Sequence, residues 1–241
     1  MSTNLIHEII PVGMLQCNCS ILGDPVTREA LVVDPGDEVD RILEILRKHN
    51  LTVRAIVSTH THIDHVGGLA KLHAVTGAPV LIHEADMPLY EMLDQQAQFL
   101  GTRTPARTKI DEYIKDGDML RWGGYAARVI HTPGHTPGSI TLFSDVGKKI
   151  DSSTAAAKSA SAVTLAPGAN DADAVSPLLI AGDTLFQGGI GRTDLWGGSM
   201  KDILNSIREK LLVLPESTRV IPGHGDETTI GDEREGNPFL Q

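Results

Sequence analysis

Three histidines and an aspartate lie within six residues in the segment Thr59-His60-Thr61-His62-Ile63-Asp64-His65. Imidazole nitrogens and carboxylate oxygens are the ligands that zinc, iron and manganese accept in proteins. The segment follows an apolar run at residues 55–58 and precedes Gly67-Gly68 and a helical pattern. In an extended backbone, side chains two residues apart point the same way, so His60 and His62 can face one ion together. The sequence therefore predicts a fold that holds a metal-binding loop between a strand and a helix.

Three further candidate ligands, which are His131, Asp183 and His224, follow short apolar runs in the same manner. The runs at residues 125–130, 178–181 and 219–221 are short and rich in aliphatic side chains, which favours strands. Catalytic residues usually lie on loops that a rigid scaffold positions. We expect the loops at the ends of these strands to converge with the 59–65 segment at one edge of the molecule.

Strand and helix patterns alternate along the rest of the chain. Strands are predicted at residues 6–10, 19–23, 30–33, 53–57, 79–83 and 139–143, and helices near 39–46, 67–76, 86–99 and 203–214. This alternation favours an α/β layered fold over an all-α or all-β one. Residues 146–176 are rich in Ala, Ser and Asp and cannot bury much apolar surface, so we expect a flexible insertion there. A lid or a partner-contact segment is the alternative for this stretch.

Length and charge limit the function classes. A chain of 241 residues is expected to form a single domain, residues 1–241. The net charge is −10 and no Lys/Arg-rich run occurs, so neither nucleic acid nor an anionic membrane is an expected partner. The N-terminus shows no signal-peptide pattern and no run reaches membrane-spanning length. Cys17 and Cys19 are expected to be reduced thiols, which favours a cytoplasmic location. The sequence leaves the oligomeric state open.

The motif blocks together resemble the metallo-β-lactamase superfamily in their order and approximate spacing. The blocks lie at residues 60–65, at residues 131–139 with His131 and His135, at residues 182–186 with Asp183, and at residues 222–225 with His224. Within that superfamily, the segments 189–194 and 228–239 are similar to those of short bacterial glyoxalase II-like proteins, which are hydroxyacylglutathione hydrolase-like enzymes.

The resemblance implies a four-layer αβ/βα sandwich, in which two mixed sheets are flanked by helices and the metals lie at the edge between the sheets. It also implies seven ligands for two divalent metal ions, with zinc expected and iron or manganese possible alternatives. The first ion would be held by His60, His62 and His131, the second by Asp64, His65 and His224, and both by a bridging Asp183.

Two residues near these motifs have open roles at this point. His135 lies in a Pro/Gly-rich turn, and we expect it to make a structural hydrogen bond rather than bind a metal ion. Asp34 follows a predicted buried strand and is either a residue that fixes a histidine tautomer or a simple turn former.

The resemblance implies hydrolysis of a small-molecule thioester or ester, such as the thioester S-lactoylglutathione, by a metal-bridging hydroxide, with Asp64 and Asp183 as catalytic residues. A bridging aspartate argues against antibiotic hydrolysis. The chain ends at Gln241, soon after His224, so we do not expect the glutathione-binding helical domain of full-length glyoxalase II enzymes. The alternatives are a persulfide dioxygenase with a single iron at His60, His131 and Asp183, a lactonase or other ester hydrolase, and a non-catalytic metal-binding protein.

Overall fold

The apolar runs of the first half of the chain pair into one six-stranded mixed sheet. The computed structural model describes residues 4–147 and 176–241. In spatial order, the first sheet holds β1 (Ile6–Val12), β2 (Cys17–Gly23), β3 (Glu29–Val33), β4 (Thr52–Val57), β5 (Val80–His83) and β6 (Glu112–Ile114). The pairs β1–β2 and β2–β3 are antiparallel, whereas β3 to β6 run parallel.

The second half forms another six-stranded mixed sheet. Its spatial order is β14 (Thr228–Thr229), β13 (Arg219–Pro222), β10 (Leu178–Gly182), β9 (Ile140–Ser144), β8 (Tyr125–His131) and β7 (Met119–Trp122). Only β10 and β13 are parallel in this sheet. Beside it lies a short ribbon of β11 (Leu185–Phe186) and β12 (Gly189–Ile190).

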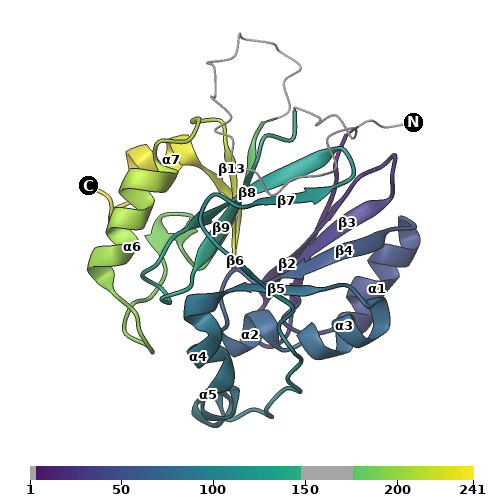
Figure 1. Ribbon diagram of the computed structural model, residues 1–241. Coiled ribbons are helices and arrows are strands. Elements are labelled where there is room, and N and C mark those ends of the chain that lie inside the picture. The colour runs from purple at the N-terminus through teal and green to yellow at the C-terminus, as the bar shows by residue number, and fades with distance from the viewer. Residues whose placement is uncertain (1–3, 148–175) are drawn as a thin grey trace.

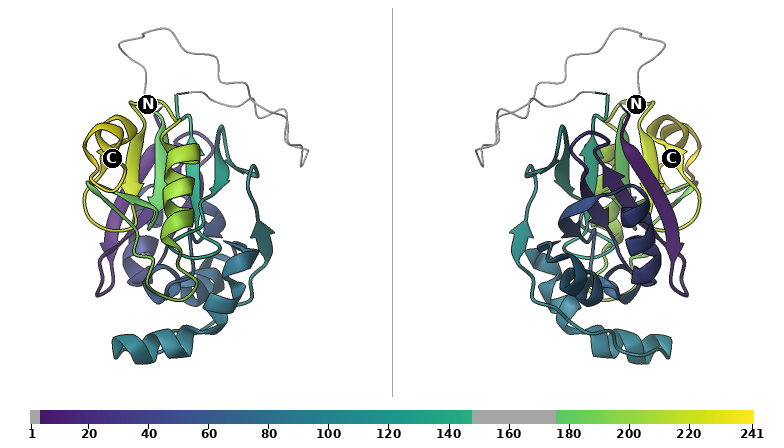
Figure 2. Two further views of the ribbon diagram at one scale, coloured as in Figure 1. Left: turned by 90° about the vertical axis from the view of Figure 1, so that its left-hand side faces the viewer. Right: turned by 90° about the vertical axis from the view of Figure 1, so that its right-hand side faces the viewer.

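Helices cover the outer face of each sheet, as Figure 1 shows with α1 and α3 on one side of the molecule and α6 and α7 on the other. The first sheet carries α1 (Val39–Lys48), α2 (Ile63–Val66), α3 (Leu69–Thr76), η1 (Glu84–Asp86), α4 (Met87–Glu91) and α5 (Leu93–Leu100). The second sheet carries α6 (Met200–Ser206), the π-helical segment η3 (Ile207–Leu211) and α7 (Ile230–Gly236). Figure 2 shows that the helices of the 87–100 region project beyond one end of the two sheets.

Three apolar clusters separate the four layers. Strand periodicity explains this, because neighbouring residues of one strand face opposite sides of a sheet. Val32 of β3 packs with the helices of the first sheet, whereas Val33 packs with Val129 of the second sheet. A third cluster joins the outer face of the second sheet to α6 and η3, for example through Leu179 and Ile203. The predicted α/β sandwich of two mixed sheets flanked by helices is therefore confirmed.

Backbone hydrogen bonds join the two sheets where the predicted site residues lie. The Ile140 N–H donates to the Thr59 carbonyl at 2.8 Å, and the Asn18 N–H donates to the Gly223 carbonyl at 2.7 Å. The first bond holds the loop after β4 against the second sheet, and the second bond joins β2 to the loop after β13. They thereby bring residues that are far apart in sequence to one edge of the sandwich.

Two sequence-based expectations concern parts of the chain outside this core. The expected insertion at residues 146–176 falls almost wholly on residues 148–175, which lie outside the described residues. Among the helices of residues 4–147 and 176–241, none has the length and apolarity that crossing a bilayer would require.

Candidate metal centre

The loop after β4 is held in one conformation by buried polar side chains. His62 is extended and directly precedes α2. The Thr61 N–H donates to Oδ2 of Asp86 at 2.9 Å, and the Ile63 N–H donates to Oε1 of Gln96 at 2.9 Å. A side chain at Gly36 could not be accommodated, because its Cβ would lie 1.6 Å from the Asp64 carbonyl oxygen. The loop is therefore fixed before any ligand binds.

The first group of candidate ligands consists of His60, His62 and His135, all of them buried. Nε2 of His135 lies 2.9 Å from Nδ1 of His62 and 3.2 Å from Nε2 of His60. Nδ1 of His135 donates to the Arg192 carbonyl at 2.8 Å, which leaves the Nε2 lone pair directed at the other two rings. Three imidazoles arranged in this way can coordinate one cation.

The second group consists of Asp64, His65 and His224. Nε2 of His224 lies 3.1 Å from Oδ2 of Asp64 and 3.4 Å from Nε2 of His65. Nδ1 of His224 donates to the Leu15 carbonyl at 2.9 Å, so its Nε2 faces the group.

Asp183 lies between the two groups. Its Oδ1 is 3.4 Å from Nε2 of His65, and its Oδ2 is 3.5 Å from Nε2 of His135 and 3.8 Å from Nε2 of His224. Oδ1 is buried and has no hydrogen-bond partner among the described residues. Because an unpaired buried carboxylate oxygen is costly, this atom fits a position facing a bound cation. The seven side chains thus form a His/Asp site suited to divalent metal ions.

The structure corrects one member of the predicted ligand set. His131 is the last residue of β8; its ring stacks on His83 with centroids 4.1 Å apart, and its Nε2 donates to the Pro137 carbonyl. His131 therefore lies outside the ligand groups, and the metal-facing position predicted for it is occupied by His135. His135 makes the expected structural hydrogen bond through Nδ1, and its Nε2 also lies within the first ligand group, which was not expected. The tetrad His-Thr-Pro-Gly occurs twice in succession, at 131–134 and 135–138, so motif matching could select either histidine.

Asp34 is one residue that fixes a histidine tautomer. Its Oδ2 lies 3.1 Å from Nδ1 of His65, and its two oxygens accept hydrogen bonds from the backbone N–H and the hydroxyl of Thr59. His65 donates its Nδ1 proton in a hydrogen bond to Asp34. The Nε2 lone pair of His65 therefore faces the other candidate ligands. Asp34 itself adopts a positive φ of 53°, which Asp tolerates better than most residues.

We predict that Asp34→Ala weakens metal binding at the second group by roughly ten- to a hundredfold, the usual effect of losing such a partner. The matched control is Asp40→Ala, because Asp40 is exposed and, among residues 4–147 and 176–241, its ion pair is with Lys71. Competition with a chelating dye would measure both affinities. Equal metal affinities in the two variants would show that Asp34 only stabilises the turn in which it lies.

A second buried carboxylate, Asp86, ties the two histidine loops together. Besides Thr61, it accepts hydrogen bonds from the Thr136 hydroxyl at 2.9 Å and from the Gly138 N–H at 2.5 Å. Thr61 lies between two ligands, and Thr136 follows His135, so Asp86 sets the distance between these loops. Burial raises the pKa of Asp86 above its ordinary value. Nothing in the local sequence indicates this role, because an aspartate at the start of a helix is typical of an ordinary N-terminal residue.

The two groups differ in their proton affinity. Burial lowers the pKa of His62 to about 3, and burial together with the neighbouring imidazoles lowers the pKa of His60 well below its ordinary value. Burial opposes protonation of His65 and His224 as well, but neighbouring acidic groups outweigh it. Cys17 and Asp34 raise the pKa of His65 well above its ordinary value, and a hydrogen bond with Asp64 raises the pKa of His224.

This difference predicts that acidification removes metal from the second group first. Imidazole must be neutral to bind a metal, so a raised pKa lets protons compete at higher pH, whereas a lowered pKa protects the site. We therefore expect the second group to lose its ion at a higher pH than the first group. Metal content after dialysis across a pH series would check the order. In His224→Gln, the release of metal at the higher pH should disappear. Release of both ions at the same pH in the parent protein would contradict the prediction.

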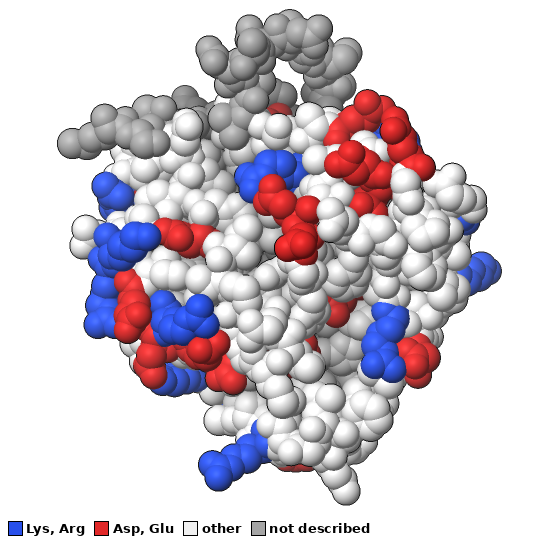
Figure 3. Space-filling model, turned by 180° about the vertical axis from the view of Figure 1, so that it is seen from behind, with Lys and Arg blue, Asp and Glu red and all other residues white. Residues whose placement is uncertain are grey.

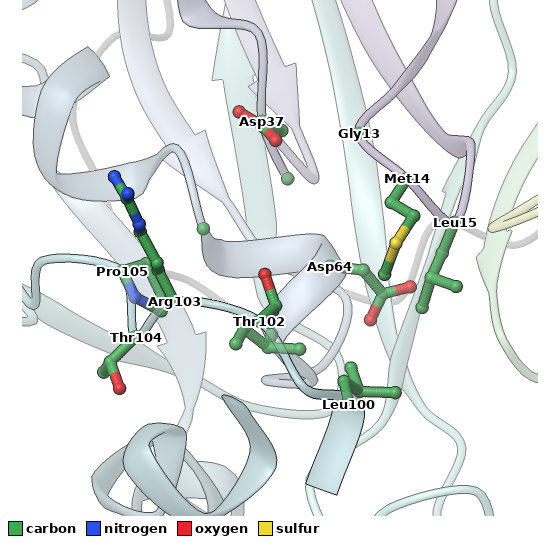
Figure 4. A pocket seen from close by; sticks show the side chains of 13 residues that line it. Gly13, Met14, Leu15, Asp37, Asp64, Leu100, Thr102, Arg103, Thr104 and Pro105 are labelled. Carbon is green, nitrogen blue, oxygen red and sulfur yellow. The ribbon is translucent and has the colours of Figure 1, made fainter. Parts of the chain in front are cut away.

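A cleft of about 330 Å³ opens beside the second group, with Asp64 in its wall (Figure 4). Its lining residues are Gly13, Met14, Leu15, Gly36, Asp37, Ile63, Asp64, Gly67, Leu100, Thr102, Arg103, Thr104 and Pro105. On the side of the first group, the ring of Trp196 lies 6.1 Å from that of His62 and 5.5 Å from that of Phe99, measured between centroids. The centre is thus flanked by space of the size that small-molecule sites occupy.

Comparisons with known proteins agree with this geometry. A family model described as the metallo-beta-lactamase superfamily matches residues 12–148 and 172–224. Hydroxyacylglutathione hydrolase GloC of Haemophilus influenzae is 35% identical over 240 residues, which cover 97% of each protein.

Two solved structures extend the comparison to three dimensions. The BLEG-1 B3 metallo-beta-lactamase superimposes with a TM-score of 0.79 at 32% identity, covering 98% of this chain and 100% of that one. TTHA1623 in a di-iron-bound form gives a TM-score of 0.74 at 33% identity, covering 97% and 100%.

Proposed function

The chain belongs to the metallo-beta-lactamase superfamily, and on that premise we propose that it is a metal-dependent hydrolase that cleaves a thioester such as S-lactoylglutathione. The observation that carries the proposal is the set of seven side chains, three histidines in one group and Asp64, His65 and His224 in the other, with Asp183 between them. The similarity to GloC over nearly the full length of both proteins supports the choice of substrate. Zinc is the expected metal, and the di-iron form of TTHA1623 supports iron as the alternative.

The residues have distinct tasks in this reaction. Bound divalent ions supply an activated water and a Lewis acid for the substrate carbonyl. Asp64 is part of both the second ligand group and the cleft wall, so its carboxylate can orient that water and accept its proton. Burial alone would raise the pKa of Asp64, but His65 and His224 hold it below its ordinary value, so the group is ionised at neutral pH. A thiolate leaves readily, so the reaction needs no strong general acid.

Hydrolysis of β-lactams is the second candidate. Asp183 between the two groups argues against it, but BLEG-1 carries the name of a β-lactamase and is similar to nearly the whole chain. Both reactions add water to a polarised carbonyl carbon and pass through a tetrahedral oxyanion. They differ in what the cleft must hold, so substrate tests separate them.

The proposal is tested by metal analysis of the purified protein together with thiol release from S-lactoylglutathione. We expect about two ions per chain, rapid thiol release, and loss of activity after chelation that added zinc or iron restores. Turnover of a chromogenic cephalosporin without thiol release would support the second candidate, and turnover of a lactone alone would support an ester hydrolase. A single iron with oxygen uptake in the presence of glutathione persulfide would replace the proposal with a dioxygenase. Full occupancy without any turnover would leave a metal-binding protein.

A further inference from the structure

The cleft beside Asp64 has an apolar end and a charged end. Figure 4 shows Asp64 close to Met14 and Leu15 on one side, Arg103 and Pro105 on the other, and Thr102 between them. Met14 is 72% exposed, so its side chain is accessible to a ligand in the cleft. A molecule that starts at the metal centre and follows this cleft therefore passes apolar side chains before it reaches a guanidinium.

The size of the cleft indicates which part of a thioester it holds. A hydroxyacyl group such as lactoyl has only a few heavy atoms and would leave most of a space of about 330 Å³ empty. The thiol portion is the larger part of substrates such as S-lactoylglutathione. The cleft is thus the place for the thiol portion, with the scissile carbonyl at the Asp64 end.

Arg103 is the one basic side chain among the described residues that line the cleft. It makes no hydrogen bond or ion pair with the rest of the described chain. Its neighbour Arg107, in contrast, pairs with Asp94 at 2.7 Å. Figure 3 shows that many basic side chains on the face opposite to that of Figure 1 also lie beside acidic ones. An unpaired guanidinium in a cleft is a ready partner for a carboxylate, which it can bind through two parallel hydrogen bonds.

Asp37 also lines the cleft and argues against a second anion close to it. Its Oδ1 accepts a hydrogen bond from the Glu38 N–H at 2.7 Å, which serves the turn before α1. Figure 4 places the Asp37 carboxylate apart from Thr102 and Pro105, on the opposite wall of the cleft. A ligand carboxylate is thus expected at Arg103 and away from Asp37, whose charge weakens the site without removing it.

We propose that Arg103 binds a carboxylate carried by the thiol portion of the thioester substrate, and that it thereby determines substrate specificity. The inference rests on the proposed hydrolysis of thioesters. Arg103 would bind the substrate at a distance from the two ligand groups. It would therefore take no part in the hydrolysis step at the metal centre.

The experiment uses lactoyl thioesters of ω-mercaptoalkanoates in a series of chain lengths, each compared with the thioester of the corresponding neutral amide. In the parent protein, we expect one chain length for which kcat/KM is roughly tenfold higher for the carboxylate than for the amide, the effect of one charged hydrogen-bonding contact. Arg103→Gln should abolish this preference through KM and leave kcat and the amide substrates unchanged. The matched control Arg107→Gln should retain the preference. Asp37→Asn should increase it, since a repulsive charge is removed.

A binding measurement keeps the inference separate from the proposed function. Thioether analogues, in which the carbonyl is replaced by methylene, cannot be hydrolysed, and their affinities can be measured by calorimetry with the metal-loaded protein. Suppose that no thioester is hydrolysed, but that the carboxylate thioether binds more tightly than the amide thioether and loses this advantage in Arg103→Gln. The proposed function then fails, and the carboxylate-binding site at Arg103 is still supported. Equal binding of carboxylate and amide at every chain length, or a preference that survives Arg103→Gln, would overturn the inference. A weaker rather than a stronger preference for the carboxylate in Asp37→Asn would overturn the inference, because the carboxylate would then not be repelled by Asp37 across the cleft.

Discussion

Replacing Asp183 with alanine should eliminate binding of a second ion and reduce thioester hydrolysis on the order of a thousandfold, because several kcal/mol of charge stabilisation depend on both ions. Asp183 contacts both groups: Oδ1 lies near His65 of the second group, and Oδ2 lies near His135 of the first and His224 of the second. Burial alone would raise the pKa of Asp183, but the neighbouring histidines hold it well below its ordinary value, so the carboxylate is charged at neutral pH. Its removal leaves the two groups without a shared negative charge.

The measurement is metal content per chain, followed by the rate of thiol release in the same sample. Asp183→Asn is the companion variant, because it preserves the shape of the side chain and removes its charge. We expect Asn to lose the second ion as well, since an amide NH₂ directed at a cation is repelled by it. Two ions bound per chain in either variant would refute the bridging role of Asp183.

A methyl group at Gly223 should disable the centre without removing any ligand. A Cβ at this position would lie 2.0 Å from Oδ1 of Asp183 and 2.8 Å from Cε1 of His65, closer than such atoms can approach. In Gly223→Ala the Asp183 carboxylate must therefore move. A displacement of about 1 Å at a catalytic centre costs on the order of a hundredfold in rate. We expect activity to fall by at least that factor, with the affinity for metal reduced in parallel.

The matched control is Gly236→Ala, because an added Cβ there would meet no atom of the described chain within 4 Å beyond its chain neighbours and the backbone of its own helix. Both glycines have backbone conformations that alanine can adopt, so the comparison isolates the contact with Asp183. Activity should be unchanged in Gly236→Ala. If Gly223→Ala retained full activity and full metal content, the close approach of Gly223 to the centre would have no functional consequence.

Long and strongly periodic segments were predictable from the sequence. The helix over 39–46 corresponds to α1, whose buried face contains Val39, Ile42 and Leu46 at helical spacing. Six of the seven predicted ligands also meet at one place, because each follows a strand end and the carboxyl ends of these strands share one edge. The exception is His131, where β8 extends one residue further than predicted and directs the ring to His83.

Short elements and long-range polar contacts were not predictable in the same way. The three-residue strand β6 and the two-residue strand β14 have too few residues for a period to show, and pairing with a neighbour defines them. The helix predicted over 86–99 is interrupted at Met92, between α4 and α5. The contacts of Asp86 with Thr61 and Thr136 join residues 25 and 50 positions apart, and no local pattern encodes such a distance.

The location of the candidate ligands has a consequence for the stability of the whole molecule. His60, His62, Asp64 and His65 follow β4 of the first sheet, whereas His135, Asp183 and His224 belong to loops of the second. An ion bound by both sets links the two sheets, and the unfolded chain, which lacks this arrangement, binds it far more weakly. Unfolding free energy then increases with the logarithm of the free metal concentration. The melting temperature of this protein should therefore depend on the free metal in the buffer and, through it, on the supply of metal in the cell.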